Sequence, residues 1–146
     1  MIIPDVNVLV YAHNTGVPEH ALARSWWERA VNGAEPIGID WSVVLGFVRL
    51  MSHPRVTVRP QAPEKLLGCI TAILSRPSVR LVTPGIQHAA LMRELFHSSG
   101  AGPRMVTDVH LAALAIEMDA LLVTNDTDFA RFAGLRLLNP LAETSK

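Results

Sequence analysis

Short apolar runs alternate with longer amphipathic stretches along this chain. The short runs are bounded by proline, glycine, asparagine or aspartate, and predict strands over residues 2–6, 36–40, 79–84, 120–125 and 135–140. The longer stretches repeat apolar residues every three to four positions, and predict helices over residues 18–33, 41–53, 64–76, 86–100, 105–119 and 128–134. Strands that alternate with helices pair in parallel and are covered on both faces. The pattern therefore predicts an α/β fold, a three-layer α/β/α domain with a mainly parallel central sheet.

No linker, internal repeat or low-complexity stretch divides the 146 residues, and this length allows one domain with a substantial core. We predict a single domain over residues 1–146, with a frayed tail at about 141–146. Hydrophobic residues make up 49% of the chain, but charge or proline interrupts each apolar run before it could span a bilayer. The amino end lacks the basic region of a signal peptide, so a cytoplasmic protein with no membrane partner is expected.

Charge and cysteine content exclude several kinds of protein. Thirteen basic residues balance thirteen acidic ones, so no overall field draws the protein to nucleic acid. Cys69 is the only cysteine, which excludes an intrachain disulfide and a cysteine-cluster zinc site. Eleven of the basic residues are arginines, and Arg49, Arg55 and Arg104 are candidate phosphate contacts, although solvated side chains are the simpler interpretation.

Four of the six aspartates follow predicted strands or begin a predicted helix. Asp5 ends the first strand, and Asn7 lies just beyond it. Asp126 and Asp128 follow the strand at 120–125, within the stretch "LLVTNDTDFARF". Asp108 falls in the first turn of a helix, where the helix dipole favours an ionised carboxylate. In sheets of this kind ligands gather at the carboxyl ends of the strands, so these side chains are expected to meet at one edge.

Each aspartate also has a plain structural interpretation. Asp108 is a helix-start residue behind a capping Thr107, and Asp126 or Asp128 is a cap or turn residue. Asp5 is harder to explain in this way, because its apolar neighbours favour burial and a buried carboxylate needs a donor or a cation. Carboxylates about 4 Å apart repel by roughly 4 kcal/mol at an effective dielectric of 20, and a divalent cation removes that cost. Oxygen ligands favour Mg²⁺ or Mn²⁺, ions that activate water for phosphodiester cleavage.

Three motifs resemble those of the PIN domain, and more narrowly those of VapC toxins from bacterial VapBC toxin-antitoxin pairs. They are "IIPDVNVLVYA", "TDVHLAALAIEMDALLVTNDTDF" and, similar to mycobacterial members, "FVRLMSHPRV". The resemblance implies a PIN-like domain and a Mg²⁺-dependent endoribonuclease, in which Mn²⁺ is an alternative ion. It also implies a cognate VapB-type antitoxin, an RNA substrate and a homodimer.

Carried over by position, the resemblance implies catalytic roles for Asp5, Asp108 and Asp126, with Asp128 as a fourth metal ligand. Asp5 and Asp108 are expected to be the principal ligands. Phe129 completes the "D.DF" ending of the motif. The resemblance also implies that Asn7 and Thr124 support the acids through hydrogen bonds.

One family feature is missing from this sequence. Many PIN domains carry a glutamate in the helix after the second strand, where this chain has Gly46 or Phe47. Asp40 replaces that acid if its side chain points inward, and otherwise it lies in a solvent-facing turn. The missing acid keeps open a non-enzymatic alternative, a PIN-fold module that binds RNA or antitoxin without cutting. A haloacid-dehalogenase-like phosphatase is a weaker alternative, because it needs a second acid where Asn7 stands.

The remaining candidate groups have simple structural interpretations. The six histidines show no paired ligand spacing and are expected at the surface or at helix caps, His110 among them. Trp26, Trp27 and Phe47 fit either a groove for an apolar segment of the antitoxin or, more simply, the core.

Overall fold

Five short parallel strands form one sheet in the order β3-β2-β1-β4-β5. The computed structural model describes residues 1–142, so most of the tail predicted to be frayed lies outside the described residues. The strands are β1 (Ile2–Pro4), β2 (Ile37–Ile39), β3 (Val79–Leu81), β4 (Leu121–Val123) and β5 (Arg136–Leu138). The chain moves outward from β1 to β3 and then returns to the other side of β1. This reversal makes the junction of β1 and β4 the topological switch point of the sheet.

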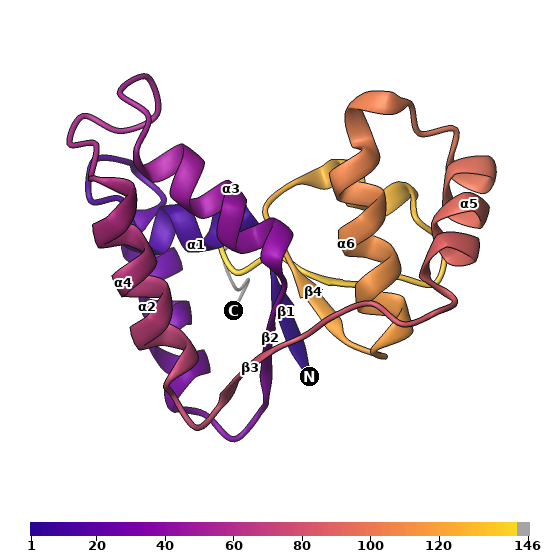
Figure 1. Cartoon of the computed structure of the whole chain (residues 1–146), viewed down its shortest axis with the longest axis horizontal. Helices are drawn as coiled ribbons and strands as arrows, with labels where there is room; N and C mark the ends of the chain where they lie inside the picture. Colours follow the sequence, from indigo (N-terminus) through magenta and orange to yellow (C-terminus); the bar gives the residue numbers. More distant parts are fainter. Residues whose placement is uncertain (143–146) are drawn as a thin grey trace.

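Helices cover both faces of the sheet, as Figure 1 shows. The helices α1, α2, α3 and α4 lie on one side, and α5 and α6 on the other. Right-handed crossovers place helices in this way when the direction of strand addition reverses. Their bounds are α1 (Val6–His13), α2 (His20–Asn32), α3 (Trp41–Met51), α4 (Pro63–Leu74), α5 (His88–Ser99) and α6 (Val106–Glu117), with 3₁₀ turns η1 (Pro103–Met105) and η2 (Thr127–Arg131). The predicted three-layer α/β/α arrangement is confirmed.

The core is formed by the sheet and by one face of each helix. Ile3, Ile37, Ile39 and Leu122 of the central strands are all at most 1% exposed. Runs buried on both faces are typical of parallel sheets, which explains why these strands are short and almost wholly apolar. Within residues 1–142, no helix is both long enough and apolar enough to cross a membrane.

The sequence pattern missed one element. Val6–His13 forms α1 directly after β1, although its run of valine and leucine lacks the polar face that marks an amphipathic helix. The Asp5 side chain accepts a hydrogen bond from the Val6 backbone N–H at 2.6 Å and caps this helix. A similar cap at Asp40 starts α3 directly after β2. Two aspartates thus turn strands into helices without an intervening loop.

Two predicted details were wrong. The last predicted helix is the 3₁₀ turn η2, and Asp126 caps it by accepting a hydrogen bond from Asp128 N–H at 2.8 Å. Thr107 does not cap α6, which begins one residue earlier and has no side-chain cap. Asp108 nevertheless lies in the first turn of that helix, as expected.

Candidate metal centre at the switch point of the sheet

The acidic residues at the carboxyl ends of β1 and β4 lie close together. The two strands are hydrogen-bonded neighbours, with Pro4 paired to Val123 at their ends. Asp5 follows the first strand and Thr124 the second, and the Asp5 backbone N–H donates to the Val123 carbonyl at 2.9 Å. Residues far apart in sequence therefore meet at one edge of the sheet.

Asp5 is the buried centre of this cluster. Only 7% of the residue is exposed, and the Thr124 hydroxyl donates to its Oδ2 at 2.7 Å. Burial raises the pKa of Asp5 to about 6, even though hydrogen bonds from Thr124 and Val6 oppose the rise. Repulsion from Asp108 and Asp126 raises the pKa further. A carboxylate held in this environment is costly without a compensating cation.

The other three acids of the cluster are less buried than Asp5. They are Asp108 and Asp126, which are half-buried, and Asp128, which is exposed. Burial raises the pKa of Asp108, and repulsion from Asp126 and then from Asp128 adds to the effect. Asp126 is half-buried, and its backbone N–H donates to the Thr124 hydroxyl at 3.0 Å. Asp128 is the most exposed and lies 3.7 Å from the Arg131 guanidinium. Charge repulsion therefore couples Asp108 to Asp5, Asp126 and Asp128, while the role of these four aspartates as metal ligands stays a prediction.

One orphaned polar atom lies beside the acids. The Asn7 side chain donates from Nδ2 to the Thr124 hydroxyl at 3.4 Å, but its buried Oδ1 has no hydrogen-bond partner among the described residues. A buried acceptor without a donor fits a cation or a water bound to it. Within residues 1–142, no three acidic, histidine or cysteine side chains are arranged to hold an ion unaided. Mg²⁺ suits such a site, because it keeps several waters and needs only one or two carboxylates.

Both positions where the glutamate of α3 is missing are tightly packed. Gly46 is buried against α1, and a Cβ at this position would lie 3.0 Å from Val6 Cγ2, so the valine side chain would have to shift. Phe47, the other candidate position, is a core residue only 1% exposed. Packing therefore disfavours a glutamate at either position.

Asp40 does not lie in the solvent-facing turn that was considered for it. It is 4% exposed, and its Oδ2 faces the Nε2 of His110 at 2.9 Å. Burial alone would raise the pKa of Asp40, but hydrogen bonds from His110 and Ser42 outweigh this and hold the pKa below its usual value.

We expect that Gly46→Glu destabilises the protein rather than supplying the missing acid. Overpacking of a tight site costs about 1–3 kcal/mol, and the charge would be buried as well. The melting temperature should fall by roughly 5 °C or more. Gly68→Glu in α4 is the matched control, because no atom lies within 4 Å of a Cβ built there. Equal melting temperatures for the two variants would contradict the packing explanation.

The expectation that the histidines lie at the surface or at helix caps was wrong for His88, and His110 is only partly exposed. His88 is 8% exposed, and its Nε2 lies 2.9 Å from Nδ1 of His110. His88 also contacts Glu117, so a row of four side chains runs from Asp40 to Glu117. No sequence signal marks this row, because its members come from two separate helices, α5 and α6, and from the cap of a third helix, α3.

The structure also shows where the candidate aromatic residues and arginines lie. Trp26, Trp27 and Phe47 are at most 9% exposed and belong to the core, so they do not form an open groove. The side chains of Arg49, Arg55 and Arg104 are exposed, which leaves their phosphate contacts a prediction.

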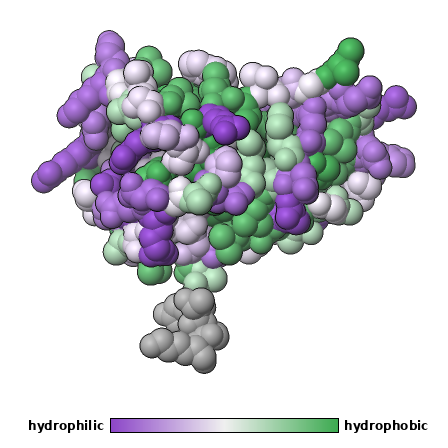
Figure 2. Space-filling model, turned by 90° about the horizontal axis from the view of Figure 1, so that it is seen from below, coloured by the Kyte–Doolittle hydropathy of each residue, from purple (hydrophilic) through white to green (hydrophobic). Residues whose placement is uncertain are grey.

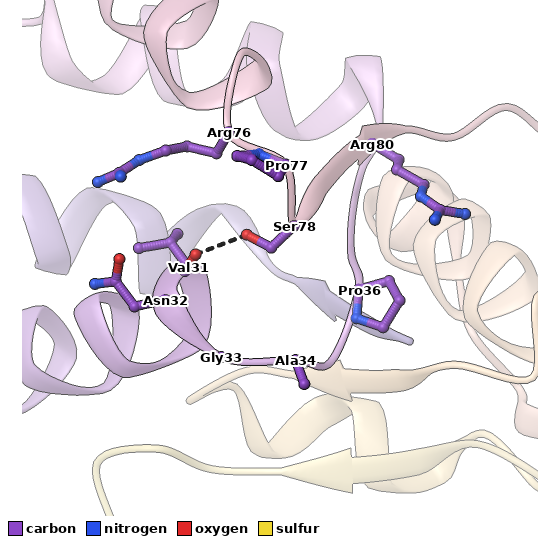
Figure 3. Close-up of a pocket in the computed structure, with 9 residues that line it drawn as sticks. All are labelled: Val31, Asn32, Gly33, Ala34, Pro36, Arg76, Pro77, Ser78 and Arg80. Carbon is purple, nitrogen blue, oxygen red and sulfur yellow. Dashed lines mark hydrogen bonds between the residues drawn. The ribbon is translucent and has the colours of Figure 1, made fainter.

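A hollow of about 440 Å³ lies at the opposite edge of the sheet, between the loops that precede β2 and β3. Figure 3 shows its Arg76 and Arg80 side chains pointing away from each other. The hollow therefore does not gather positive charge around one point. Figure 2 shows apolar and polar residues interspersed over the lower face of the molecule.

The sequence matches the PIN domain family over residues 2–135. It is 41% identical over 143 residues to ribonuclease VapC33 of Mycobacterium tuberculosis, an alignment that covers 98% of this chain and 100% of that protein. It is also 39% identical over 141 residues to VapC ribonuclease Mb2897 of Mycobacterium bovis, covering 97% of this chain and 96% of the relative.

Solved structures of low sequence identity share the fold. VapBC2 from Rickettsia felis, bound to a DNA fragment from its promoter, matches with a TM-score of 0.67 at 23% identity, covering 95% of this chain and 98% of that chain. Mycobacterium tuberculosis VapC20, a toxin that cleaves the sarcin-ricin loop, matches with a TM-score of 0.62 at 17% identity, covering 93% and 99%. The matched fold and the near full-length sequence identity agree with the resemblance carried by the three motifs. This chain therefore belongs to the PIN-domain family and, within it, to the VapC ribonucleases.

Proposed function

We propose that this protein is the toxin of a type II toxin-antitoxin system, a Mg²⁺-dependent endoribonuclease that hydrolyses RNA phosphodiester bonds in the cytoplasm. Mn²⁺ is accepted in place of Mg²⁺. Asp5, Asp108 and Asp126 hold the ion, and Asp128 contributes at the rim. One observation carries the assignment: Asp5 is a buried carboxylate beside two other acids, and its pKa is raised to about 6. Within residues 1–142, one sheet and one hydrophobic core support the proposal that the chain, residues 1–146, is a single domain.

Each residue of the acidic cluster has a separate role in holding the metal ion or its water, according to its position. Thr124 and the Val6 N–H fix both oxygens of Asp5, so this carboxylate presents its free lone pairs in one orientation. Asp108 lies at the positive end of α6, which favours its ionised form. Asn7 Oδ1 offers an acceptor to a water beside the acids. When bound, a divalent ion supplies an activated water and stabilises charge that develops on the phosphate.

A cognate VapB-type antitoxin and a second copy of the chain are the protein partners in this proposal. Several structural neighbours are complexes of a VapC with its VapB, some of them bound to DNA. Exposed apolar side chains on α3 and α6 offer a surface for such contacts. Among them, Trp41 is 48%, Leu45 62% and Val106 49% exposed.

The function is tested by incubating purified, antitoxin-free protein with total cellular RNA in the presence of Mg²⁺, Mn²⁺ or EDTA. We expect cleavage with either ion, none with EDTA, and a loss of about 10-fold or more in Asp108→Asn. Cleavage that persists in EDTA would contradict the metal-dependent mechanism.

The packing at Gly46 favours a second candidate function. The family's glutamate is absent and packing disfavours it there, so in this alternative the chain is a module that binds RNA or antitoxin without cutting. Folded parent protein that retains RNA in a binding assay but cleaves nothing with either ion would establish this alternative.

A further inference from the structure

Four side chains, those of Asp40, His110, His88 and Glu117, form a continuous hydrogen-bonded row. His110 Nε2 lies 2.9 Å from Asp40 Oδ2, His110 Nδ1 lies 2.9 Å from His88 Nε2, and His88 Nδ1 lies 3.0 Å from Glu117 Oε2. The other oxygen of Glu117 accepts a hydrogen bond from Gly85 N–H at 2.6 Å. The row thus links five places in the fold. They are Asp40 at the cap of α3, His88 in α5, His110 and Glu117 near the two ends of α6, and Gly85 in the loop before α5.

Every ring nitrogen of the two histidines has a partner in the row. The three contacts measure 2.9 Å, 2.9 Å and 3.0 Å. A buried polar network in which every member has a partner is rigid and holds one geometry.

The row supplies the polar contact between α3 and α6. Among the hydrogen bonds and ion pairs of residues 1–142, only the one between His110 and Asp40 joins α3 or its cap to α6. A hollow of about 440 Å³ separates the two helices beside this contact, with Leu45 of α3 and Thr107 of α6 in its lining. Side chains therefore do not fill the space between the two helices at this point. Thr107 directly precedes Asp108.

We propose that His88 and Glu117 are positioning residues that act through His110 to set where the first turn of α6, and so Asp108, lies relative to Asp5. This inference rests on the proposed metal site and adds residues that touch neither metal nor RNA. The row braces α6 against α3 where this chain lacks the glutamate that other PIN domains place in α3.

Glu117 gives the sharpest test because it lies far from the acids. It is nine residues beyond Asp108, about 14 Å along the helix axis. Glu117→Ala removes the acceptor for His88 and frees the histidine ring. Glu117→Gln preserves the row, because the amide donates to His88 Nδ1, His88 Nε2 donates to His110, and His110 Nε2 donates to Asp40.

The experiment measures Mn²⁺ affinity by titration calorimetry on folded, full-length protein. We expect about 10-fold weaker binding in Glu117→Ala and parent-like binding in Glu117→Gln. In metal-free protein, the NMR signals of the Asp108 and Val109 backbone amides should move only in the alanine variant. His97→Ala is the matched control, since His97 is an exposed histidine of α5 outside the row.

Gly85→Ala provides a second route that removes no member of the row. A Cβ at Gly85 would lie 2.5 Å from Glu117 Oε1 and displace the carboxylate, so it too should weaken Mn²⁺ binding. If either variant folds and binds Mn²⁺ as tightly as the parent, the positioning role is overturned. If Asp5→Ala and Asp108→Ala also bind Mn²⁺ like the parent, the proposed metal site itself has failed.

Discussion

Asp5→Asn is expected to reduce RNA cleavage by at least about 100-fold while making the metal-free protein more stable at neutral pH. Loss of an outer partner of a metal ligand alone costs 10–100-fold, and Asp5 is the most buried acid of the cluster. Asparagine keeps the shape and one oxygen but cannot carry the negative charge that holds a cation. Activity and stability should therefore change in opposite directions.

The gain in stability follows from the pKa of Asp5. Burial and neighbouring acids raise that pKa from 3.8 to about 6, so ionisation at neutral pH costs the folded state about 3 kcal/mol. Asparagine removes the charge and keeps the cap of α1. After allowing for weaker hydrogen bonds, we expect a gain of about 2 kcal/mol and a melting temperature roughly 5 °C higher.

Both results are measured on the same preparations, cleavage with Mg²⁺ and thermal unfolding in EDTA. Asp119→Asn is the matched control, because the Asp119 side chain is 96% exposed and lies outside the cluster. Its φ of 48° is also one that asparagine adopts readily. If Asp5→Asn proves less stable than the parent at pH 7.5, Asp5 does not carry the cost assigned to it.

The second large effect is a loss of stability as the pH rises. An acid whose pKa is higher in the folded than in the unfolded state binds its proton more tightly when folded. Its contribution to the free energy of unfolding is complete below pH 3.8 and is lost as the pH passes through about 6. Metal-free protein should therefore lose about 3 kcal/mol from Asp5 between pH 4 and 7.

Other groups titrate in the same pH range. The effect of Asp5 is therefore measured as the difference in unfolding free energy between the parent and Asp5→Asn. Burial lowers the pKa of His13, which destabilises the fold as the pH falls, whereas burial raises the pKa of Asp108. Both effects are present in the parent and in Asp5→Asn. The difference in urea unfolding free energy between the two proteins, followed from pH 4.5 to 7.5 in EDTA, isolates Asp5. A constant difference across that range would refute the prediction, and saturating Mg²⁺ should reduce its pH dependence.

Much of the site was accessible from the sequence because its residues follow strands. Asp5 stands in an apolar run and Asp126 follows another, and a parallel sheet brings the ends of such runs to one edge. Their shared location therefore follows from local pattern and sheet geometry alone. The roles of these residues as metal ligands stay predictions until Mn²⁺ binding is measured.

The remaining features depend on contacts between helices, which the sequence does not encode locally. The row from Asp40 to Glu117 joins residues whose neighbours give no sign of pairing, and His88 was expected at the surface. The same holds for Gly46, where only the distance to Val6 shows that packing disfavours the missing acid. The α1 helix was missed because its valine-rich run is buried on most sides, and burial depends on tertiary packing.

The pairing of the first strand with the fourth also sets the time at which a newly made chain becomes active. Asp5 emerges early in translation, but Asp126 and the hydroxyl of Thr124 follow some 120 codons later, a delay of about 6–24 s at 5–20 residues per second. Until then the nascent chain has only part of its acidic cluster. Under the proposed function, the chain therefore stays inactive until the fourth strand has been synthesised, and an antitoxin already present in the cell has that interval in which to meet it.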